Sequence, residues 1–371
     1  MIIPDKMKCA RMHEVGAPLV IEKIDTPKPR RHDVLVRVRA CGIVPNLSNV
    51  LANWPTWFPE YPLPRLPAIF GLDPAGEIAA VGEDVLGFSV GDRVYVNPGR
   101  GCDTCSHCVA GNRIECRYFG MAGYFALSQD GLTLLDQYPY GGMAEYMTAP
   151  ASALVKLSDN TTFEEAARFG YIGTAYGGLA KTNIGPSSTV LINGCSGTLG
   201  VSSVIIALAM GARKVLGTGR NADLLERIKA IDPHRITVFS TLAGAMDEWV
   251  QAETDGHGAD IVLDCLGPGS SQGTFLQGLY NMERGGQFVN IGAVQDSVPV
   301  LMHYLTSASR ALLGSTWFTT EQARQVAAMA GSGVLDMTVF KHHVSNLDDV
   351  NQAISGMTAG NGGLDNYVIA P

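Results

Sequence analysis

The chain has 371 residues, which is enough for about two domains at roughly 150 residues each. Hydrophobic residues make up 46% and charged residues 17%, a composition typical of a globular protein and not of a disordered one. The net charge of −8 argues against nucleic acid or an anionic membrane as a partner, because both are bound mainly by clustered Lys and Arg. No apolar run suits a signal peptide or a membrane helix, so we expect a cytoplasmic protein with reduced thiols.

The first part of the chain, residues 1–160, reads as short strands broken by Gly and Pro. Three such runs are "VLVRVRACG" at 34–42, "AGEIAAVGEDV" at 75–85 and "VGDRVYV" at 90–96. Their alternation and turn residues predict a twisted, mainly antiparallel β domain.

The pattern changes to alternating strands and helices over residues 161–310. Strands are expected in "TVLINGCSGTLG" at 189–200, which ends in glycines, and in "RKVLGTG" at 213–219, "ADIVLDCLG" at 259–267 and "GGQFVNIGA" at 285–293. Helices are expected at 201–212 and 222–231. This alternation predicts right-handed βαβ units and a doubly wound parallel sheet, so the fold class is α/β. Residues 311–371 end in the strand-like "NYVIAP", and we expect them to complete the first domain.

A glycine motif follows the first strand of this parallel sheet. "NGCSGTLG" places Gly194, Gly197 and Gly200 between a strand and a helix, the context that a dinucleotide-binding turn requires. The unpaired N–H groups of the helix N-terminus suit a pyrophosphate. The alternative is a turn needed only for packing. The predicted cofactor-binding residues are Gly194, Ser196, Gly197, Thr198, Leu199, Gly200, Gly219, Arg220, Asn221, Gly267 and Gly292.

The end of the second strand indicates which cofactor is used. An NAD site usually has an acidic residue there for the ribose hydroxyls. This chain reads "LGTGRN", with Gly219 and Arg220 in that place, which favours NADP(H) over NAD(H). The alternative for Arg220 is a solvated arginine at the start of a helix.

Four of the eight cysteines lie close together, in the segment of about residues 98–120. Cys102, Cys105, Cys108 and Cys116 follow the spacing C-x2-C-x2-C-x7-C, which predicts one tetrahedral zinc. A closed shell of four thiolates leaves no position for substrate, so this zinc would be structural. The alternative, four free surface thiols, would leave oxidisable groups exposed.

At this point the chain resembles the zinc-type medium-chain dehydrogenases and reductases, the alcohol dehydrogenase-like superfamily. The resemblance rests on the cysteine segment, the glycine motif, "GDRV" at 91–94, "GGMAEY" at 141–146, "DCLG" at 264–267 and "GGQFVNIG" at 285–292. It implies a GroES-like catalytic domain, a Rossmann domain inserted before the C-terminal segment, a structural zinc, and a homodimer or homotetramer.

The catalytic zinc of this family is not expected here. Its ligands usually lie in motifs like "CGICHTD" and "GHE" and before a "TGYG"-like turn. The matching segments are "CGIVPNLSN", "FGLDPAGE" and "FGYIGTAYG", with Val44, Leu72 and Gly170 at the three ligand positions. Cys41 is one thiol and cannot build the site alone.

Without that metal, charge on a substrate oxygen needs hydrogen-bond donors or an acid. Asn46 and Asn49 are the candidate donors, and Asp73 and Tyr171 are the candidate proton donors or relays. Each has a structural alternative: Asn46 can cap a helix, and Asp73 before a proline can satisfy a turn.

The segment 53–67, "NWPTWFPEYPLPRLP", carries Trp54, Trp57, Phe58 and Tyr61. In the family that it resembles, this segment borders the substrate entrance, so we expect a bulky apolar or aromatic small-molecule substrate. An ordinary proline-stiffened loop is the alternative.

The leading hypothesis is an NADP(H)-dependent oxidoreductase that transfers hydride to a carbonyl or activated alkene, or from an alcohol, without a catalytic zinc. The alternatives are a lyase-type enzyme that retains the cofactor, a conventional zinc-dependent alcohol dehydrogenase with unusual ligands, and a cofactor-binding sensor without catalysis.

Overall fold

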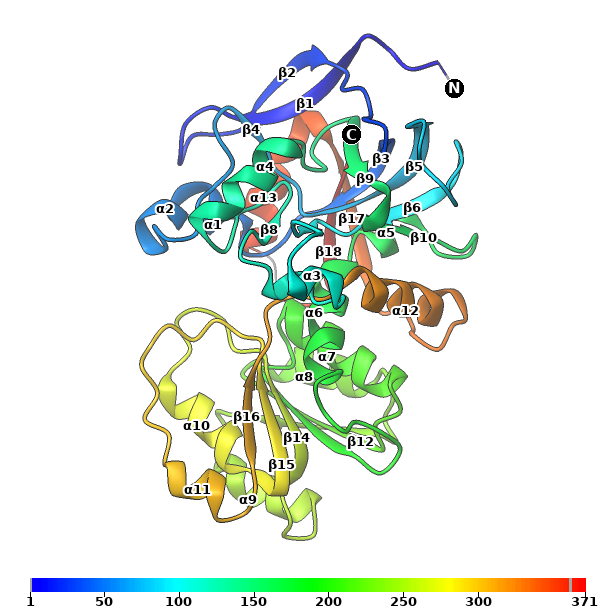
Figure 1. The fold of residues 1–371 in the computed structure, drawn as a ribbon. Coiled ribbons are helices and arrows are strands. Elements are labelled where there is room, and N and C mark those ends of the chain that lie inside the picture. The colour runs from blue at the N-terminus through cyan, green and yellow to red at the C-terminus, as the bar shows by residue number, and fades with distance from the viewer. Residues whose placement is uncertain (1, 360–361) are drawn as a thin grey trace.

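The computed structural model describes residues 2–359 and 362–371. The molecule has two parts, one above the other in Figure 1, and both chain termini lie in the upper part. The upper part is built mainly from the first 160 residues and the last 30, and the lower part from the residues between them.

The largest sheet of the upper part has seven strands, in the order β10-β6-β5-β3-β18-β17, with β9 also paired to β3. Its strands are β3 (Asp33–Gly42), β5 (Asp73–Val81), β6 (Arg93–Val96), β9 (Tyr146–Pro150), β10 (Leu154–Lys156), β17 (Lys341–Asn346) and β18 (Asp365–Ala370). The sheet is antiparallel except between β17 and β18. Strand β3 is apolar and buried along most of its length because it lies inside this sheet.

The C-terminal strand, β18, pairs with a strand of the first domain. Val368 and Ile369 of β18 pair with Gly42 and Cys41 of β3. The backbone N–H of Ile43 donates to the carbonyl of Tyr367. Strand β18 therefore holds the segment that leads into Asn46.

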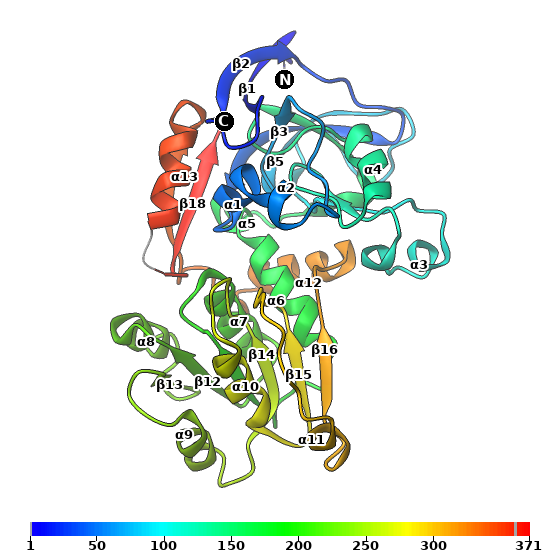
Figure 2. The same ribbon diagram turned by 90° about the vertical axis from the view of Figure 1, so that its left-hand side faces the viewer.

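Smaller sheets and short helices complete the upper part. A three-stranded sheet contains β1 (Lys6–Met12), β2 (Val20–Asp25) and β4 (Ala68–Ile69), and β7 (Gly99–Arg100) pairs with β8 (Gly120–Met121). The helices are α1 (Leu47–Ala52), α2 (Trp54–Trp57), α3 (Ser106–Val109), α4 (Leu132–Gln137), α5 (Phe163–Ala166), α6 (Phe169–Leu179), α12 (Thr320–Gly331) and α13 (Val350–Ala359). Helix α6 runs from the upper part toward the lower one (Figure 2).

The lower part is a six-stranded parallel sheet in the order β13-β12-β11-β14-β15-β16. Its strands are β11 (Thr189–Asn193), β12 (Lys214–Gly219), β13 (Ile236–Ser240), β14 (Ala259–Asp264), β15 (Met282–Asn290) and β16 (Ala311–Gly314). Its helices are α7 (Thr198–Ala209), α8 (Ala222–Lys229), α9 (Met246–Glu253), α10 (Gln272–Tyr280) and α11 (Met302–Thr306). Strand β16 lies just beyond residue 310, where the sequence placed the end of this region.

The strand order reverses between β11 and β14, and this reversal positions the cofactor site. From β11 the chain builds outward through β12 and β13, and then returns to build β14, β15 and β16 on the other side. In doubly wound sheets, ligands bind at the carboxyl ends of the strands at this point.

The α/β fold expected from the sequence is confirmed. Across residues 2–359 and 362–371, no helix is long and apolar enough to cross a membrane.

Candidate functional site

The glycine motif forms the turn between β11 and α7. Gly194 has φ +88°, a left-handed conformation that glycine adopts readily. Gly197 is the N-cap of α7, and a Cβ at Gly200 would overlap the carbonyl of Gly194. The turn therefore approaches its own helix closely and leaves backbone N–H groups at the N-terminus of α7 for an anion.

A cavity of about 410 Å³ opens at this turn. Six predicted cofactor-binding residues line it: Gly194, Ser196, Gly197, Gly219, Arg220 and Gly267. Thr198, Leu199 and Gly200 lie in the first turn of α7, directly behind the glycine turn. The cavity thus joins the end of β12, the glycine turn and the segment after β14, as an extended dinucleotide requires.

Two predicted cofactor residues have other structural roles. The side-chain oxygen of Asn221 accepts from the N–H of Leu224 at 3.1 Å, so it caps α8. Gly292 packs so closely against Leu266 and Asp264 that a Cβ would not fit. Neither residue lines the cavity at the glycine turn.

A polar network at the strand ends supports the turn and was not foreseen from the sequence. The Thr218 hydroxyl donates to Asn193 Oδ1 at 3.0 Å, and Asn193 Nδ2 donates to Asp264 Oδ1 at 2.8 Å. The N–H of Gly194 donates to the Thr218 hydroxyl at 3.3 Å. Burial raises the pKa of Asp264 to about 7, against hydrogen bonds that lower it. The signal in the sequence is that each polar residue lies at or next to the end of an apolar strand.

The ribose end of the cavity has no carboxylate among its described lining residues. A Cβ at Gly219 would lie 2.9 Å from the Ser196 hydroxyl and 3.1 Å from Leu225, so Ser196 occupies the space that an acidic side chain would need. Arg220 is exposed beside it and is the one charged residue lining this cavity. This end of the cavity therefore offers a positive charge and no carboxylate among its described lining residues.

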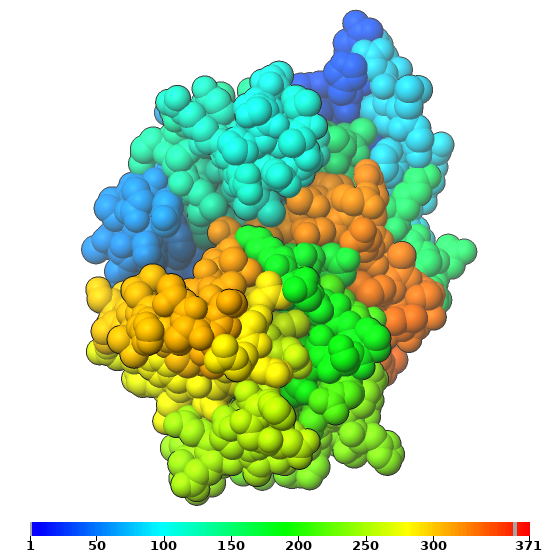
Figure 3. Space-filling model, turned by 60° about the horizontal axis from the view of Figure 1, so that its bottom comes forward, coloured from blue at the N-terminus to red at the C-terminus, as the bar shows by residue number. Residues whose placement is uncertain are grey.

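A second cavity, of about 620 Å³, lies where the two parts of the molecule meet. Its upper wall is Asn46, Trp54, Trp57 and Phe58, and its lower wall is Pro268, Ala293, Val294 and Gln295. Figure 3 shows this region, with the blue α2 segment beside the gold segment that follows β15. Gly267 and Gly269 line the first cavity and Pro268 lines the second, so the two cavities adjoin.

Part of the aromatic segment forms the short helix α2, which packs on the core and also lines the second cavity. Trp54 is 8% exposed and packs against Phe58 and Phe125, with ring centroids 4.5 and 4.3 Å apart. Trp57 is 44% exposed and lines the second cavity. One face of α2 therefore joins the core, and the other gives the cleft an apolar aromatic wall.

Asn46 provides the amide that faces this cleft. It holds the N-cap position of α1 but makes no side-chain cap hydrogen bond. Asn49 Nδ2 donates to Asn46 Oδ1 at 3.1 Å, and Asn53 Nδ2 donates to Asn49 Oδ1 at 3.4 Å. Because its oxygen is already accepting, Asn46 is oriented to donate through its nitrogen. Asn49 lies behind it and does not line the cleft.

Tyr124 lies next to Asn46 and was not singled out in the sequence. Burial and the nearby Tyr171 raise the pKa of its hydroxyl well above the usual value, whereas a hydrogen bond with the Asn46 side chain lowers it. Tyr171 is partly exposed, and burial of its hydroxyl also raises its pKa. Tyr124 comes from a loop far from residue 46 in sequence, so no local pattern linked the two.

Asp73 is buried, at 1% exposed, and does not line the cleft. The Tyr95 hydroxyl donates to its Oδ1 at 2.8 Å. Burial raises the pKa of Asp73 to about 7, although Tyr95, Arg168 and the N–H of Gly170 lower it. Asp73 begins β5 and is not part of a turn.

The three positions at which the family carries catalytic zinc ligands are apolar or filled. Val44 and Leu72 are 4% and 5% exposed and belong to the hydrophobic core. A Cβ at Gly170 would overlap both carboxylate oxygens of Asp73. The Asp73 carboxyl thus fills the space that a side chain at 170 would need. The lack of a catalytic zinc remains a prediction.

The cysteine segment, in contrast, can hold a metal ion. The Sγ atoms of Cys102, Cys105, Cys108 and Cys116 all lie within 4.8 Å of one another. Zinc–sulfur bonds of about 2.3 Å give a tetrahedron with edges of about 3.8 Å, so this set fits zinc. In residues 2–359 and 362–371, no other group of three or more His, Cys, Asp or Glu ligands comes together in this way. Figure 2 shows α3 at the edge of the upper part, on the other side of it from α13.

Backbone groups in this segment favour thiolates. The N–H groups of Cys105 and Tyr118 donate to the sulfurs of Cys102 and Cys116, each at 3.4 Å. Hydrogen bonds from Thr104, and a further one from Cys105, lower the pKa of Cys102 to about 6. Burial, in contrast, raises the pKa of Cys108 to about 12 and also raises that of Cys116. The hydrogen bonds therefore favour the thiolate mainly at Cys102.

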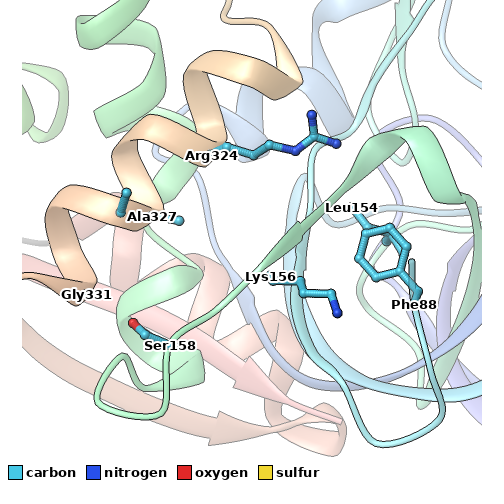
Figure 4. A pocket seen from close by; sticks show the side chains of 8 residues that line it. Phe88, Leu154, Lys156, Ser158, Arg324, Ala327 and Gly331 are labelled. Carbon is cyan, nitrogen blue, oxygen red and sulfur yellow. The ribbon is translucent and has the colours of Figure 1, made fainter. Parts of the chain in front are cut away.

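A third hollow, of about 480 Å³, lies between β10 and α12 (Figure 4). Phe88, Lys156 and Arg324 line it, and Lys156 forms an ion pair with Asp92 at 2.9 Å. It contains none of the predicted catalytic, cofactor or metal residues, so we do not place the active site there.

Two parts of the chain match known domain families. Residues 30–159 match the alcohol dehydrogenase GroES-like domain, and residues 198–332 match the zinc-binding dehydrogenase domain. An alcohol dehydrogenase from Moraxella sp. (strain TAE123) is 30% identical over 348 residues, which are 93% of this chain and 94% of that protein.

Solved structures share the fold. A zinc-binding dehydrogenase from Sinorhizobium meliloti 1021, bound to NADP, has a TM-score of 0.83 and 22% identity, and the match covers 99% of this chain and 100% of that one. A protein from E. coli CFT073 described as a short chain alcohol dehydrogenase, complexed with NADH, has a TM-score of 0.82 and 19% identity, with coverage of 99% and 100%. The chain therefore belongs to the zinc-type medium-chain dehydrogenase/reductase superfamily and is an alcohol dehydrogenase-like oxidoreductase.

Proposed function

We propose that this oxidoreductase uses NADP(H) to transfer hydride to a carbonyl or activated alkene, or from an alcohol, without a catalytic zinc. The observation that carries the proposal is the replacement of the three expected ligands by Val44, Leu72 and the Gly170–Asp73 contact, next to a cleft whose polar group is an oriented amide. The division of the chain near residues 160 and 310 is part of the proposal, as are a cytoplasmic location and a homodimer or homotetramer.

The cofactor would lie along the first cavity. The glycine turn and the N-terminus of α7 suit the pyrophosphate, and Gly219 with Arg220 suits the adenosine ribose. Gly267 and Pro268 mark the passage toward the cleft. When bound, the nicotinamide supplies or accepts the hydride.

The substrate would lie in the second cavity. Trp54, Trp57 and Phe58 offer an apolar aromatic wall that suits a bulky apolar or aromatic compound. The Asn46 amide nitrogen would donate to the substrate oxygen as negative charge develops there. Asn49 would keep that nitrogen facing the cleft because it occupies the Asn46 oxygen.

A proton must also reach or leave the substrate. We propose that Tyr171 acts as a proton relay and that the buried Asp73, which has a pKa of about 7, acts as the proton store. The cysteine segment would hold one structural zinc per chain and take no part in the reaction.

A stoichiometry measurement tests the reaction class. Consumption of NADPH should equal formation of reduced product, because hydride leaves the cofactor once in each turnover. A turnover that leaves NADPH unchanged would favour the lyase alternative, and dinucleotide binding without any turnover would favour a sensor.

Two matched variants test the role of Asn46. Asn46→Leu should lower kcat by about 100-fold or more, the usual cost of removing an oxyanion donor. Asn49→Leu should lower it by about tenfold, because the Asn46 amide remains but is less well oriented. Equal, small effects in both would argue against the oriented amide.

A third variant tests the cofactor preference. Arg220→Ala should weaken NADPH binding by about tenfold and leave NADH binding within about twofold, because only NADPH has the 2′-phosphate. Equal losses for both dinucleotides would argue against a phosphate contact at Arg220.

A further inference from the structure

Arg168 is a buried arginine at a junction of three segments. It is 2% exposed and lies immediately before α6. Its Nη2 donates to the carbonyl of Gly363 at 2.7 Å and to the carbonyl of Thr198, the first residue of α7, at 3.4 Å. Its guanidinium lies 4.8 Å from the ring centroid of Phe340 and 5.5 Å from that of Tyr171.

The C-terminal segment that Arg168 contacts lies directly on the glycine turn. The N–H of Gly363 donates to the carbonyl of Ser196 at 2.9 Å. A Cβ at residue 363 would overlap the carbonyl of Gly197, so the two backbones are in contact. Gly363 leads into β18, which pairs with β3 ahead of Asn46. Arg168 therefore ties the glycine turn to the segment that leads into β18, the strand that pairs with β3 ahead of Asn46.

The charge of Arg168 lies behind the N-terminus of α7. Burial lowers its pKa to about 10, so it stays positively charged at neutral pH. The acidic groups that act on it are Asp73 and Asp365. Asp73 has a pKa of about 7 and is partly protonated there, and Asp365 is bound to His343 at 2.7 Å. A buried cation that is not fully paired makes this helix N-terminus more favourable for an anion.

We propose that Arg168 is a positioning residue for the cofactor pyrophosphate, because it fixes the glycine turn against the catalytic domain and adds a buried positive charge behind it. The inference rests on the dinucleotide function proposed above. It assigns to Arg168 an effect on the pyrophosphate in particular, and not only on the stability of the fold.

The test compares ligands that contain pyrophosphate with ligands that lack it. NADPH and NADH are the dinucleotides, and adenosine 2′-monophosphate and adenosine are the fragments. Isothermal titration gives their dissociation constants for the wild type, Arg168→Met and Arg168→Lys. Arg168→Met should weaken dinucleotide binding by about tenfold and fragment binding by less than about twofold, since only the dinucleotide meets the turn that Arg168 holds.

Arg93→Met is the matched control. Arg93 also donates to two backbone carbonyls, those of Ser158 at 2.7 Å and Thr161 at 2.6 Å, and lies 4.6 Å from the ring centroid of Phe163. None of these partners belongs to the glycine turn. Arg93→Met should leave the ratio of dinucleotide to fragment affinity unchanged.

Arg168→Lys keeps the charge but loses the planar fork, so it should recover part of the dinucleotide affinity. If Arg168→Met does not fold, the lysine variant decides: a loss of about threefold confined to dinucleotides supports the proposal, and an equal loss for fragments overturns it. No change in dinucleotide affinity in a folded variant also overturns it. A wild type that binds no dinucleotide would instead contradict the proposed function.

Discussion

The cysteine segment and the cleft are the two places where a protein of this superfamily can hold a metal. The cysteine segment has a ligand side chain at each of its four positions, and the cleft has none at the three expected positions. The first brings four sulfurs within 4.8 Å of one another. The second has Val44 and Leu72 in the core and a carboxyl packed against Gly170. On the proposed function, the cysteine segment would hold a metal ion, and the cleft would use an amide, a buried acid and aromatic rings in its place. Zinc binding should depend on the cysteine segment and not on the cleft, and the predictions below compare these two places.

The largest effect should come from the cysteine segment. Replacing Cys105 and Cys108 together by Ser should abolish zinc binding and lower the free energy of unfolding by on the order of 5 kcal/mol, because a structural metal contributes directly to folding. Urea denaturation and metal analysis measure the two effects. Cys9→Ser, at a buried thiol outside the cluster, should retain the zinc. Full zinc content in the double variant would show that these thiols are not ligands.

The second prediction concerns the lost ligand position. Gly170→Cys should lower the free energy of unfolding by about 3 kcal/mol and should not create a zinc site, because the new Cβ overlaps the Asp73 carboxyl. Gly185→Cys, where a Cβ meets nothing within 4 Å, is the control. The cost at 170 should shrink in an Asp73→Ala background, since the overlap is removed. A stable Gly170→Cys variant with additional zinc would contradict this account of the cleft.

The third prediction concerns pH. Asp73 has a pKa raised from 3.8 to about 7, so its contribution to stability is complete below about pH 4 and is lost as pH rises toward 7. The free energy of unfolding of the wild type, relative to Asp73→Asn, should therefore fall steadily across that range.

Asp92 supplies a control of opposite sign. Its pKa is lowered, chiefly by a hydrogen bond from Lys156, so its contribution is present above pH 4 and is lost as pH falls further. Thermal melts of the wild type, Asp73→Asn and Asp92→Asn across pH 3 to 8 measure both trends. A flat difference between the wild type and Asp73→Asn would mean that Asp73 is ionised as readily as in the unfolded chain.

The smallest effect should come from the aromatic wall. Trp57→Ala should raise KM for a bulky aromatic substrate by about fivefold, roughly 1 kcal/mol, and leave KM for a small aliphatic one unchanged. Phe88→Ala, in the hollow of Figure 4, should change neither value. Equal changes for both substrates would place Trp57 outside the substrate site.

Features that depend on neighbouring residues in the sequence could be predicted. The cysteine spacing located a cluster that can bind metal, and the glycine motif located a cavity at the start of α7. The alternation of strands and helices predicted the parallel sheet. Each of these depends on local geometry that a few neighbouring residues determine.

Features formed by distant residues could not be predicted. The pKa of Asp73 depends on Tyr95 and Arg168, and the Asn46 side chain forms a hydrogen bond with Tyr124. The sequence indicated that Gly170 lacks a ligand atom but not that a carboxyl fills its space. Such contacts arise from packing between elements that the chain brings together only when it folds.

The central claim is that the cleft works without a metal while the cysteine segment holds one. Metal content of purified, active protein, measured by inductively coupled plasma mass spectrometry against protein concentration, tests it most directly. We predict one zinc per chain. A reproducible value of two in active protein would contradict the account.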